Sequence, residues 1–167
     1  WMSVALDGQR ESRPHFDMVA ELSHPAAEYL PRNTDEAREY LRSVLRNSIR
    51  HHMVADVPVG IFLSSGRDST TITALASEVA NQGLRTFTLG FSEFRGTEND
   101  EVPMAEQVAH LYGAIHETRW VDQEDFKREL SKIIDSMDQP SIDGVNTYFV
   151  AKCAQETGLK VALSGLG

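Results

Sequence analysis

The sequence predicts an α/β fold: a doubly wound parallel sheet with helices on both faces, preceded by a short N-terminal β segment. Predicted strands alternate four times with longer segments whose apolar residues recur at helical spacing, and the first of these strands, residues 59–63, is a continuously apolar run. Uninterrupted apolar runs are expected of parallel strands that are covered on both faces. With 41% hydrophobic and 25% charged residues, the 167 residues can also bury one sizeable core.

At the N-terminus, residues 1–6 and 14–19 are predicted to be two strands about a turn. Asp7-Gly8 lies between them, and this pair suits the positive φ angles of a hairpin. This β segment is expected to be separate from the main sheet.

A helix is predicted from residue 33 to about residue 52, after a linker bracketed by Pro25 and Pro31. Asn33 is a suitable N-cap, and Glu36 can reach back to it in a capping box. Several apolar side chains recur at helical spacing and predict one buried stripe. They are Ala37, Leu41, Val44, Leu45 and Ile49.

The alternating part of the chain follows. Its predicted elements are strand 59–63, helix 69–81, strand 85–91, helix 100–112, strand 116–121, a helix after residue 122, a helix from Pro140 to Gly158, and strand 160–163. Gly83 and Gly113 are expected to end the first two helices, and Asp122 to cap the third. The acidic residues before the second helix are expected to form its solvated start, with Asp100 as cap. This order of elements predicts right-handed crossovers.

Composition excludes several classes of function. Sixteen basic residues against 25 acidic ones give a net charge of −9, and no basic run could follow a nucleic acid backbone. No apolar run approaches the ~20 residues of a membrane helix. The one cysteine, Cys153, cannot form an internal disulfide, so a cytoplasmic protein is expected. Because the sequence opens on Trp1 and closes in a glycine-bearing loop, we expect a fragment of a longer protein.

The loop that follows strand 59–63 carries the strongest functional signal. Its residues are Ser64, Ser65, Gly66, Arg67, Asp68 and Ser69. Backbone N–H groups and a helix dipole converge there on a bound anion, and small residues let a phosphate approach closely. A carboxylate beside a phosphate is repelled unless a hard cation lies between them, so Asp68 is expected to bind Mg²⁺. The alternative is an ordinary turn in which Asp68 or Ser69 only caps the helix.

Other nucleotide motifs are absent from the sequence. There is no G-x-x-x-x-G-K-S/T, and no G-x-G-x-x-G follows a predicted strand. Kinase-like and dehydrogenase-like functions therefore lose support.

Residues 57–69 resemble the pyrophosphate loop of the ATP-pyrophosphatase superfamily, written S-G-G-x-D-S, in its asparagine synthetase branch. Further similar segments follow in the same order as in that family. They are Arg85 to Phe91, Asn99-Asp100-Glu101 with Ala105 and Val108-Ala109, Gly113, His116-Glu117, Asp138-Gln139-Pro140 with Asp143 and Tyr148, and Leu163 to Gly167. The resemblance covers residues 31–167.

The resemblance implies an adenine nucleotide alpha hydrolase-like fold and an ATP- and Mg²⁺-dependent amidotransferase. In this reaction a small-molecule carboxylate, aspartate or a related acid, is adenylated with release of pyrophosphate, and ammonia then forms the amide with release of AMP. A glutaminase domain outside residues 31–167 would supply the ammonia, and residues 1–30 would be the tail of that domain.

The resemblance also implies roles for single residues. Ser64, Ser65, Gly66, Arg67, Asp68 and Ser69 would bind the pyrophosphate of ATP, with Asp68 as catalytic residue and metal ligand. The adenosine pocket would be lined by Phe62, Leu63, Leu89, Ser164 and Gly165.

Two positions depart from the family pattern. Ser65 replaces the usual second glycine, which is a strained change if that position needs a positive φ. Leu166 stands where many asparagine synthetases have glutamate. An isobutyl group cannot accept a proton, which favours a substrate other than aspartate. A second acidic pair of the family would follow Gly167, and the family's glutaminase cysteine is absent from this sequence.

Other polar residues have plainer interpretations. Cys153 is expected to be a small buried thiol. His51 and His52 complement the dipole at a helix end and lack further ligands at zinc spacing. Asp138 and Asp143 either begin turns or belong to the family's substrate segment.

Two other functions remain open. One is a β-lactam-synthetase-like enzyme that closes a ring with its own substrate amine. The other is a non-catalytic module that binds adenine nucleotides. A homodimer is also kept as an expectation, because apolar surface exposed at the edge of a truncated sheet favours association.

Overall fold

The computed structural model describes residues 1–23, 31–80, 83–139, 141 and 143–165. They form two compact units, residues 1–41 and 42–167. The predicted domain boundary near residue 30 falls beside a segment outside the described residues and stays a prediction. Among the described residues, no helix is both long enough and apolar enough to cross a membrane.

The first unit begins with an antiparallel pair of strands, β1 (Met2–Val4) and β2 (Arg10–Ser12), joined through Gly8 at φ +87°. The hairpin turn is confirmed, but the prediction of a strand over 14–19 is wrong. The second strand ends before that segment, and α1 (Met18–Ser23) follows. The Asp17 carboxylate accepts hydrogen bonds from the N–H groups of Val19 and Ala20, which favours a helix start there.

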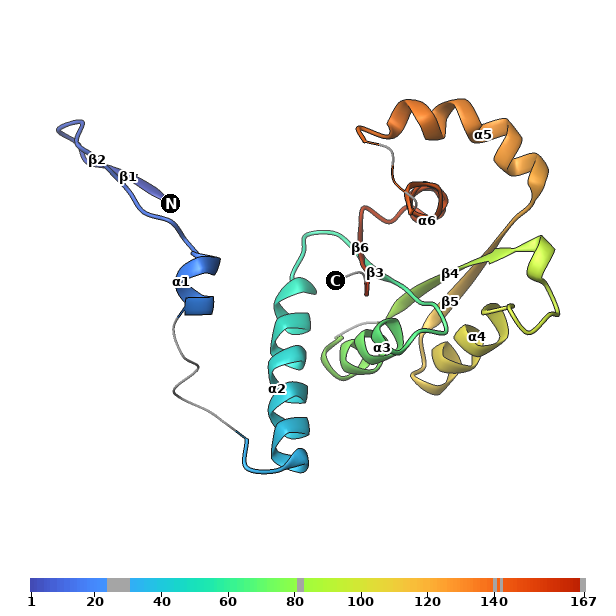
Figure 1. The fold of residues 1–167 in the computed structure, drawn as a ribbon, viewed down its shortest axis with the longest axis horizontal. Coiled ribbons are helices and arrows are strands. Elements are labelled where there is room, and N and C mark those ends of the chain that lie inside the picture. The colour runs from blue at the N-terminus through green and yellow to red at the C-terminus, as the bar shows by residue number, and fades with distance from the viewer. Residues whose placement is uncertain (24–30, 81–82, 140, 142, 166–167) are drawn as a thin grey trace. The chain divides into compact units, whose positions relative to one another are not determined.

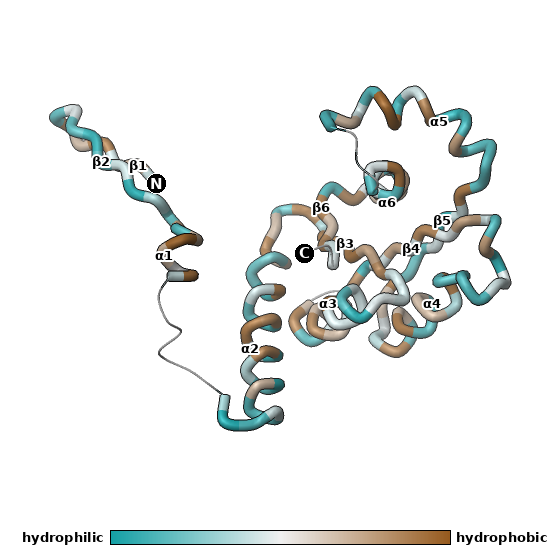
Figure 2. The backbone as a smooth tube through the Cα atoms, in the orientation of Figure 1, coloured by the Kyte–Doolittle hydropathy of each residue, from teal (hydrophilic) through white to brown (hydrophobic). Residues whose placement is uncertain are grey.

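Helix α2 (Thr34–His52) begins as predicted, because Asn33 Oδ1 accepts from the N–H groups of the next residues at 3.0 and 2.9 Å. Glu36 reaches back one residue further than expected, to the N–H of Arg32. The prediction of one buried apolar stripe along this helix is largely wrong. Ile49 is buried, whereas Val44 and Leu45 are 48% and 37% exposed, and apolar residues run along the helix in Figure 2. Periodicity identifies the apolar face of a helix but not whether a neighbour covers it.

The second unit contains a parallel sheet of β3 (Val59–Phe62), β4 (Arg85–Phe91), β5 (Ile115–Val121) and β6 (Val161–Leu163). The strand order is β5-β4-β3-β6, so the chain moves outward from β3 to β5 and then returns to the other side of β3. This reversal confirms the predicted doubly wound fold and creates a switch point between β3 and β6.

Four helices cover the sheet. They are α3 (Arg67–Val79), α4 (Val102–Leu111), α5 (Gln123–Ser136) and α6 (Gly144–Glu156), and a 3-10 turn, Ser92–Phe94, follows β4. Figure 1 shows α3 and α4 on one face of the sheet and α5 and α6 on the other. Alternate residues of β3 follow this arrangement, because Ile61 packs with α3 and Phe62 with α6.

Most helix boundaries agree with the prediction. Asp122 and Asp125 form a capping box at the start of α5, and Gly113 adopts φ +64° after α4. Asp100 accepts the N–H of Val102, the first residue of α4. Gly83 is an exception: α3 already ends at Val79, and Gly83 has no positive φ, so it is not the predicted helix stop.

Candidate functional site

A cavity of about 450 Å³ lies at the carboxyl ends of β3, β4 and β6, where an open α/β sheet binds its ligands. It brings together most of the residues predicted from the sequence. The predicted residues that line it are Phe62, Leu63, Ser64, Gly66, Asp68, Ser69, Leu89, Ser164 and Gly165. Ser65 and Arg67 belong to the same loop but are exposed and do not line the cavity.

The Ser69 hydroxyl organises the loop between β3 and α3. This side chain is 6% exposed, and its Oγ accepts the N–H of Ser64 at 3.2 Å. The same oxygen lies 2.9 Å from Ser64 Oγ and within donating distance of the carbonyls of Ser64 (3.2 Å) and Gly66 (3.1 Å). Ser64 Oγ in turn accepts the N–H of Gly66. Ser69 therefore fixes the shape of the loop from its buried side.

Ser65 causes no strain in this loop. No described residue other than glycine has a positive φ, so serine fits here as well as glycine would. The departure from the family's glycine pattern is thus conformationally neutral.

The loop after β6 lies against the start of α3. A Cβ atom added at Gly165 would lie 3.0 Å from the backbone nitrogen of Ser69 and 3.1 Å from the Cβ of Asp68. Only glycine permits this approach without displacement of the backbone. Leu166 and Gly167 lie outside the described residues, so the structure does not test the prediction made for Leu166.

One wall of the cavity is apolar. Phe62 and Leu89 contribute to it, and Phe87, Phe91 and Phe94 add rings that the sequence analysis did not assign to the site. Leu63 is 2% exposed and also packs against α4, so it supports this wall from beneath. An apolar, ring-lined wall beside a polar loop is suited to a flat base joined to a charged group.

The lining also includes polar residues that the sequence analysis placed in a solvated helix start. Asn99, Asp100 and Glu101 line the cavity, and Asn146 and Val150 of α6 complete it. The Asp100 carboxylate is already engaged, because it accepts the N–H groups of Gly96 at 2.8 Å and Val102 at 3.1 Å. The sequence did contain a signal for Asn99, Asp100 and Glu101. They follow β4, the strand next to β3, and the carboxyl ends of such neighbouring strands border the same ligand site.

The charge of the cavity is negative. Its described lining includes three carboxylates, Asp68, Asp100 and Glu101, and no lysine, arginine or histidine. In the part of the chain that the structure describes, no group of three or more His, Cys, Asp or Glu side chains could hold a metal ion alone. Asp68 fits Mg²⁺ in the manner usual at phosphate sites, where one or two carboxylates and the substrate phosphates share the ion.

The remaining singled-out residues lie outside this cavity. Cys153 is buried, and burial raises the pKa of its thiol. His51 and His52 each contact a carbonyl of their own helix. Asp143 is the exposed N-cap residue of α6 and makes no side-chain cap bond.

Comparison of the sequence with known proteins identifies a family and several relatives. The family model for asparagine synthase matches residues 40–167. Asparagine synthetase [glutamine-hydrolyzing] 1 of Bacillus subtilis is 37% identical over 159 residues, covering 93% of this chain and 24% of that protein. A putative asparagine synthetase [glutamine-hydrolyzing] of Mycobacterium tuberculosis is 41% identical over 145 residues, covering 85% and 22%.

Among solved structures, an NH3-dependent NAD synthetase from Campylobacter jejuni, in complex with the nitrate ion, matches with a TM-score of 0.48 at 11% identity, covering 75% of this chain and 54% of that one. The chain spans about a quarter of the length of the curated relatives named above. The family match extends over most of the chain and includes every residue that lines the cavity, so this chain belongs to the asparagine synthase family.

Proposed function

We propose that this chain forms the ATP-binding part of an amidotransferase of the asparagine synthetase type. The observation that carries the proposal is the single cavity in which a small-residue loop, an apolar wall and the end of β6 meet. The family membership of the chain and the printed names of its relatives support the same function.

The chemistry of the loop and of the apolar wall supports a proposed placement for ATP. The adenine ring lies against Phe62 and Leu89, and Ser164 and Gly165 border the nucleoside. The pyrophosphate lies at the loop 64–69, where backbone N–H groups at the start of α3 and the dipole of that helix favour an anion. Ser65 and Arg67 are proposed to contact the phosphates from the outer side of the loop.

A triphosphate cannot enter an acidic cavity without positive charge to offset it. Asp68 is proposed to hold Mg²⁺, which neutralises the charge of the phosphates. The contribution of the chain's own residues is to orient the nucleotide so that its α-phosphate faces the acceptor carboxylate.

The proposed reaction has two steps. A carboxylate oxygen of the acceptor attacks the α-phosphorus of ATP, and the bond to the β-phosphate bridging oxygen breaks, which releases pyrophosphate. Ammonia then attacks the acyl carbon, loses a proton and expels AMP. We propose that the ammonia comes from a glutaminase domain, as the glutamine-hydrolysing names of the relatives suggest. Aspartate or a related acid is the proposed acceptor.

The test is pyrophosphate and AMP release by the full-length protein with ATP, Mg²⁺ and a panel of carboxylates, with ammonia or glutamine. Asp68→Asn should abolish turnover. Asp56→Asn, which removes an exposed carboxylate before β3, is the matched control and should behave as wild type. Absence of carboxylate-dependent pyrophosphate from the folded wild type would refute the proposal. Turnover that needs neither ammonia nor glutamine would instead indicate an intramolecular amide former.

A further inference from the structure

Glu129 of α5 is buried although its side chain is charged. It is 4% exposed, and it is the one charged side chain among the buried residues that the structure describes. A buried carboxylate is unfavourable unless it is paired and hydrogen-bonded.

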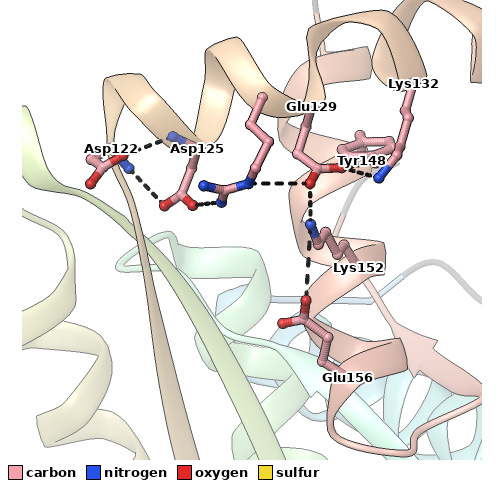
Figure 3. Close-up of polar contacts among 8 residues, drawn as sticks. Asp122, Asp125, Glu129, Lys132, Tyr148, Lys152 and Glu156 are labelled. Atoms are coloured by element: carbon pink, nitrogen blue, oxygen red, sulfur yellow. Dashed lines mark hydrogen bonds and ion pairs between the residues drawn. The ribbon is translucent and has the colours of Figure 1, made fainter.

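The principal partners come from α6, as Figure 3 shows. Lys152 Nζ lies 2.7 Å from Glu129 Oε1, and Tyr148 Oη donates to Glu129 Oε2 at 2.8 Å. These two contacts hold the pKa of Glu129 at about 2, so the carboxylate is charged at all working pH values.

The other charged neighbours are more exposed. Lys132 lies 3.2 Å from Glu129 on α5 but is 70% exposed, and Arg128 is engaged by Asp125. Glu156 of α6 lies 4.0 Å from Lys152. Exposed ion pairs contribute little, so the polar link between the two helices depends on Glu129 with Tyr148 and Lys152.

The side of α6 that meets Glu129 is opposite the side that lines the cavity. Tyr148 and Lys152 are four residues apart and share one face of the helix. Asn146 and Val150, which line the cavity, are also four apart and are offset by two residues from the first pair. Two residues correspond to about half a turn of helix, so a rotation of α6 that loosened one face would displace the other.

We propose that Glu129 is a positioning residue for the nucleotide cavity: by fixing Tyr148 and Lys152 it sets the rotation of α6 and thereby the placement of Asn146 and Val150. This inference rests on the proposed function, because it concerns the affinity of the same cavity for ATP. A buried ion pair adds little net stability but is costly to break on one side, which suits a role in fixing geometry.

The experiment is steady-state kinetics of the full-length protein at varied ATP. Glu129→Gln and Lys152→Met should each raise the KM for ATP by about tenfold and change kcat by about twofold or less, as expected when a binding wall is displaced while the chemistry is retained. The double variant should have a KM closer to wild type than either single variant, because no unpaired charge remains buried. Glu124→Gln, which breaks an exposed pair with Lys127 on the same helix, is the matched control with unchanged KM.

The KM also separates positioning from simple loss of stability. A smaller folded fraction lowers kcat per total protein but leaves KM unchanged. If Glu129→Gln does not fold, Tyr148→Phe keeps the charge and removes one hydrogen bond, and its KM should rise by about threefold.

Three results would count against this reasoning. An unchanged KM in the folded single variants, with wild-type ATP turnover intact, would overturn the role of Glu129 alone. A double variant whose effects simply multiply would also overturn it. A wild-type protein that neither binds nor cleaves ATP would instead refute the proposed function, and the inference with it.

Discussion

Replacement of Ser69 by alanine tests whether one buried hydroxyl maintains the loop between β3 and α3. The side chain is 6% exposed and has four polar contacts between 2.9 and 3.2 Å, all within the loop. Alanine removes no packing volume beyond the hydroxyl, so any change in the free energy of unfolding comes from these contacts.

The expected magnitude follows from the groups left behind. The N–H of Ser64 loses its acceptor, and two carbonyls lose a shared donor. An unsatisfied buried polar group costs about 1–3 kcal/mol, and the carbonyls can turn to water because the loop is partly exposed. We expect the free energy of unfolding to fall by about 1–3 kcal/mol. If the same free energy must be spent to order the loop when ATP binds, the affinity for ATP falls by about fivefold to a hundredfold.

The assay is thermal unfolding together with titration of ATP and Mg²⁺ in the full-length protein. Ser77→Ala on the same helix is the matched control, since its hydroxyl donates to the carbonyl of Ala74 within the helix and lies outside the loop 64–69. Alanine is the better helix former, so this variant should stay within about 0.5 kcal/mol of wild type. Equal midpoints and equal affinities for the two variants would refute a structural role of Ser69.

Three further changes have distinct outcomes. Gly165→Ala places a Cβ 3.0 Å from the backbone nitrogen of Ser69 and should weaken ATP binding more than it lowers the unfolding midpoint; calorimetric titration measures the first and a thermal scan the second. Gly60→Ala forces a methyl group against Leu159 and 2.7 Å from a Phe87 ring carbon, and should destabilise the fold by about 1–3 kcal/mol in thermal unfolding. The third change is a fall in pH. Because the pKa of Glu129 is lowered from 4.5 to about 2, its contribution to stability is complete above about pH 4.5 and is lost as the pH falls toward 2. The difference in unfolding midpoint between wild type and Glu129→Gln should therefore narrow over that range, and a constant difference would contradict the assignment.

The sheet could be predicted from the sequence because β3 is a short apolar run and strand-like segments alternate with segments of helical periodicity. The prediction for 85–91 matches β4 residue for residue, and Asp122 and Gly113 mark helix ends through local hydrogen bonding and backbone conformation. Local signals of this kind need no knowledge of distant residues.

Features that depend on distant neighbours were not predictable in the same way. The stripe on α2 has helical periodicity, yet Val44 and Leu45 are exposed because burial depends on a covering partner. Glu129 is unremarkable in the sequence, and only the packing of α5 on α6 makes it a buried charge. Asn99 and Glu101 resemble an ordinary acidic helix start until the cavity is formed.

The place of β6 in the sheet has a consequence for the order in which the protein folds. Of the four described strands of this sheet, β6 is synthesised last, yet it pairs with β3, and Gly165 meets Asp68 across about a hundred residues of intervening chain. Contacts of such long sequence separation form late and slowly. A folding intermediate that contains only β3, β4 and β5 would have the loop 64–69 without the loop after β6 that packs against it. During refolding, the gain of nucleotide affinity should therefore report the pairing of β6 with β3 and not the earlier collapse of the other strands.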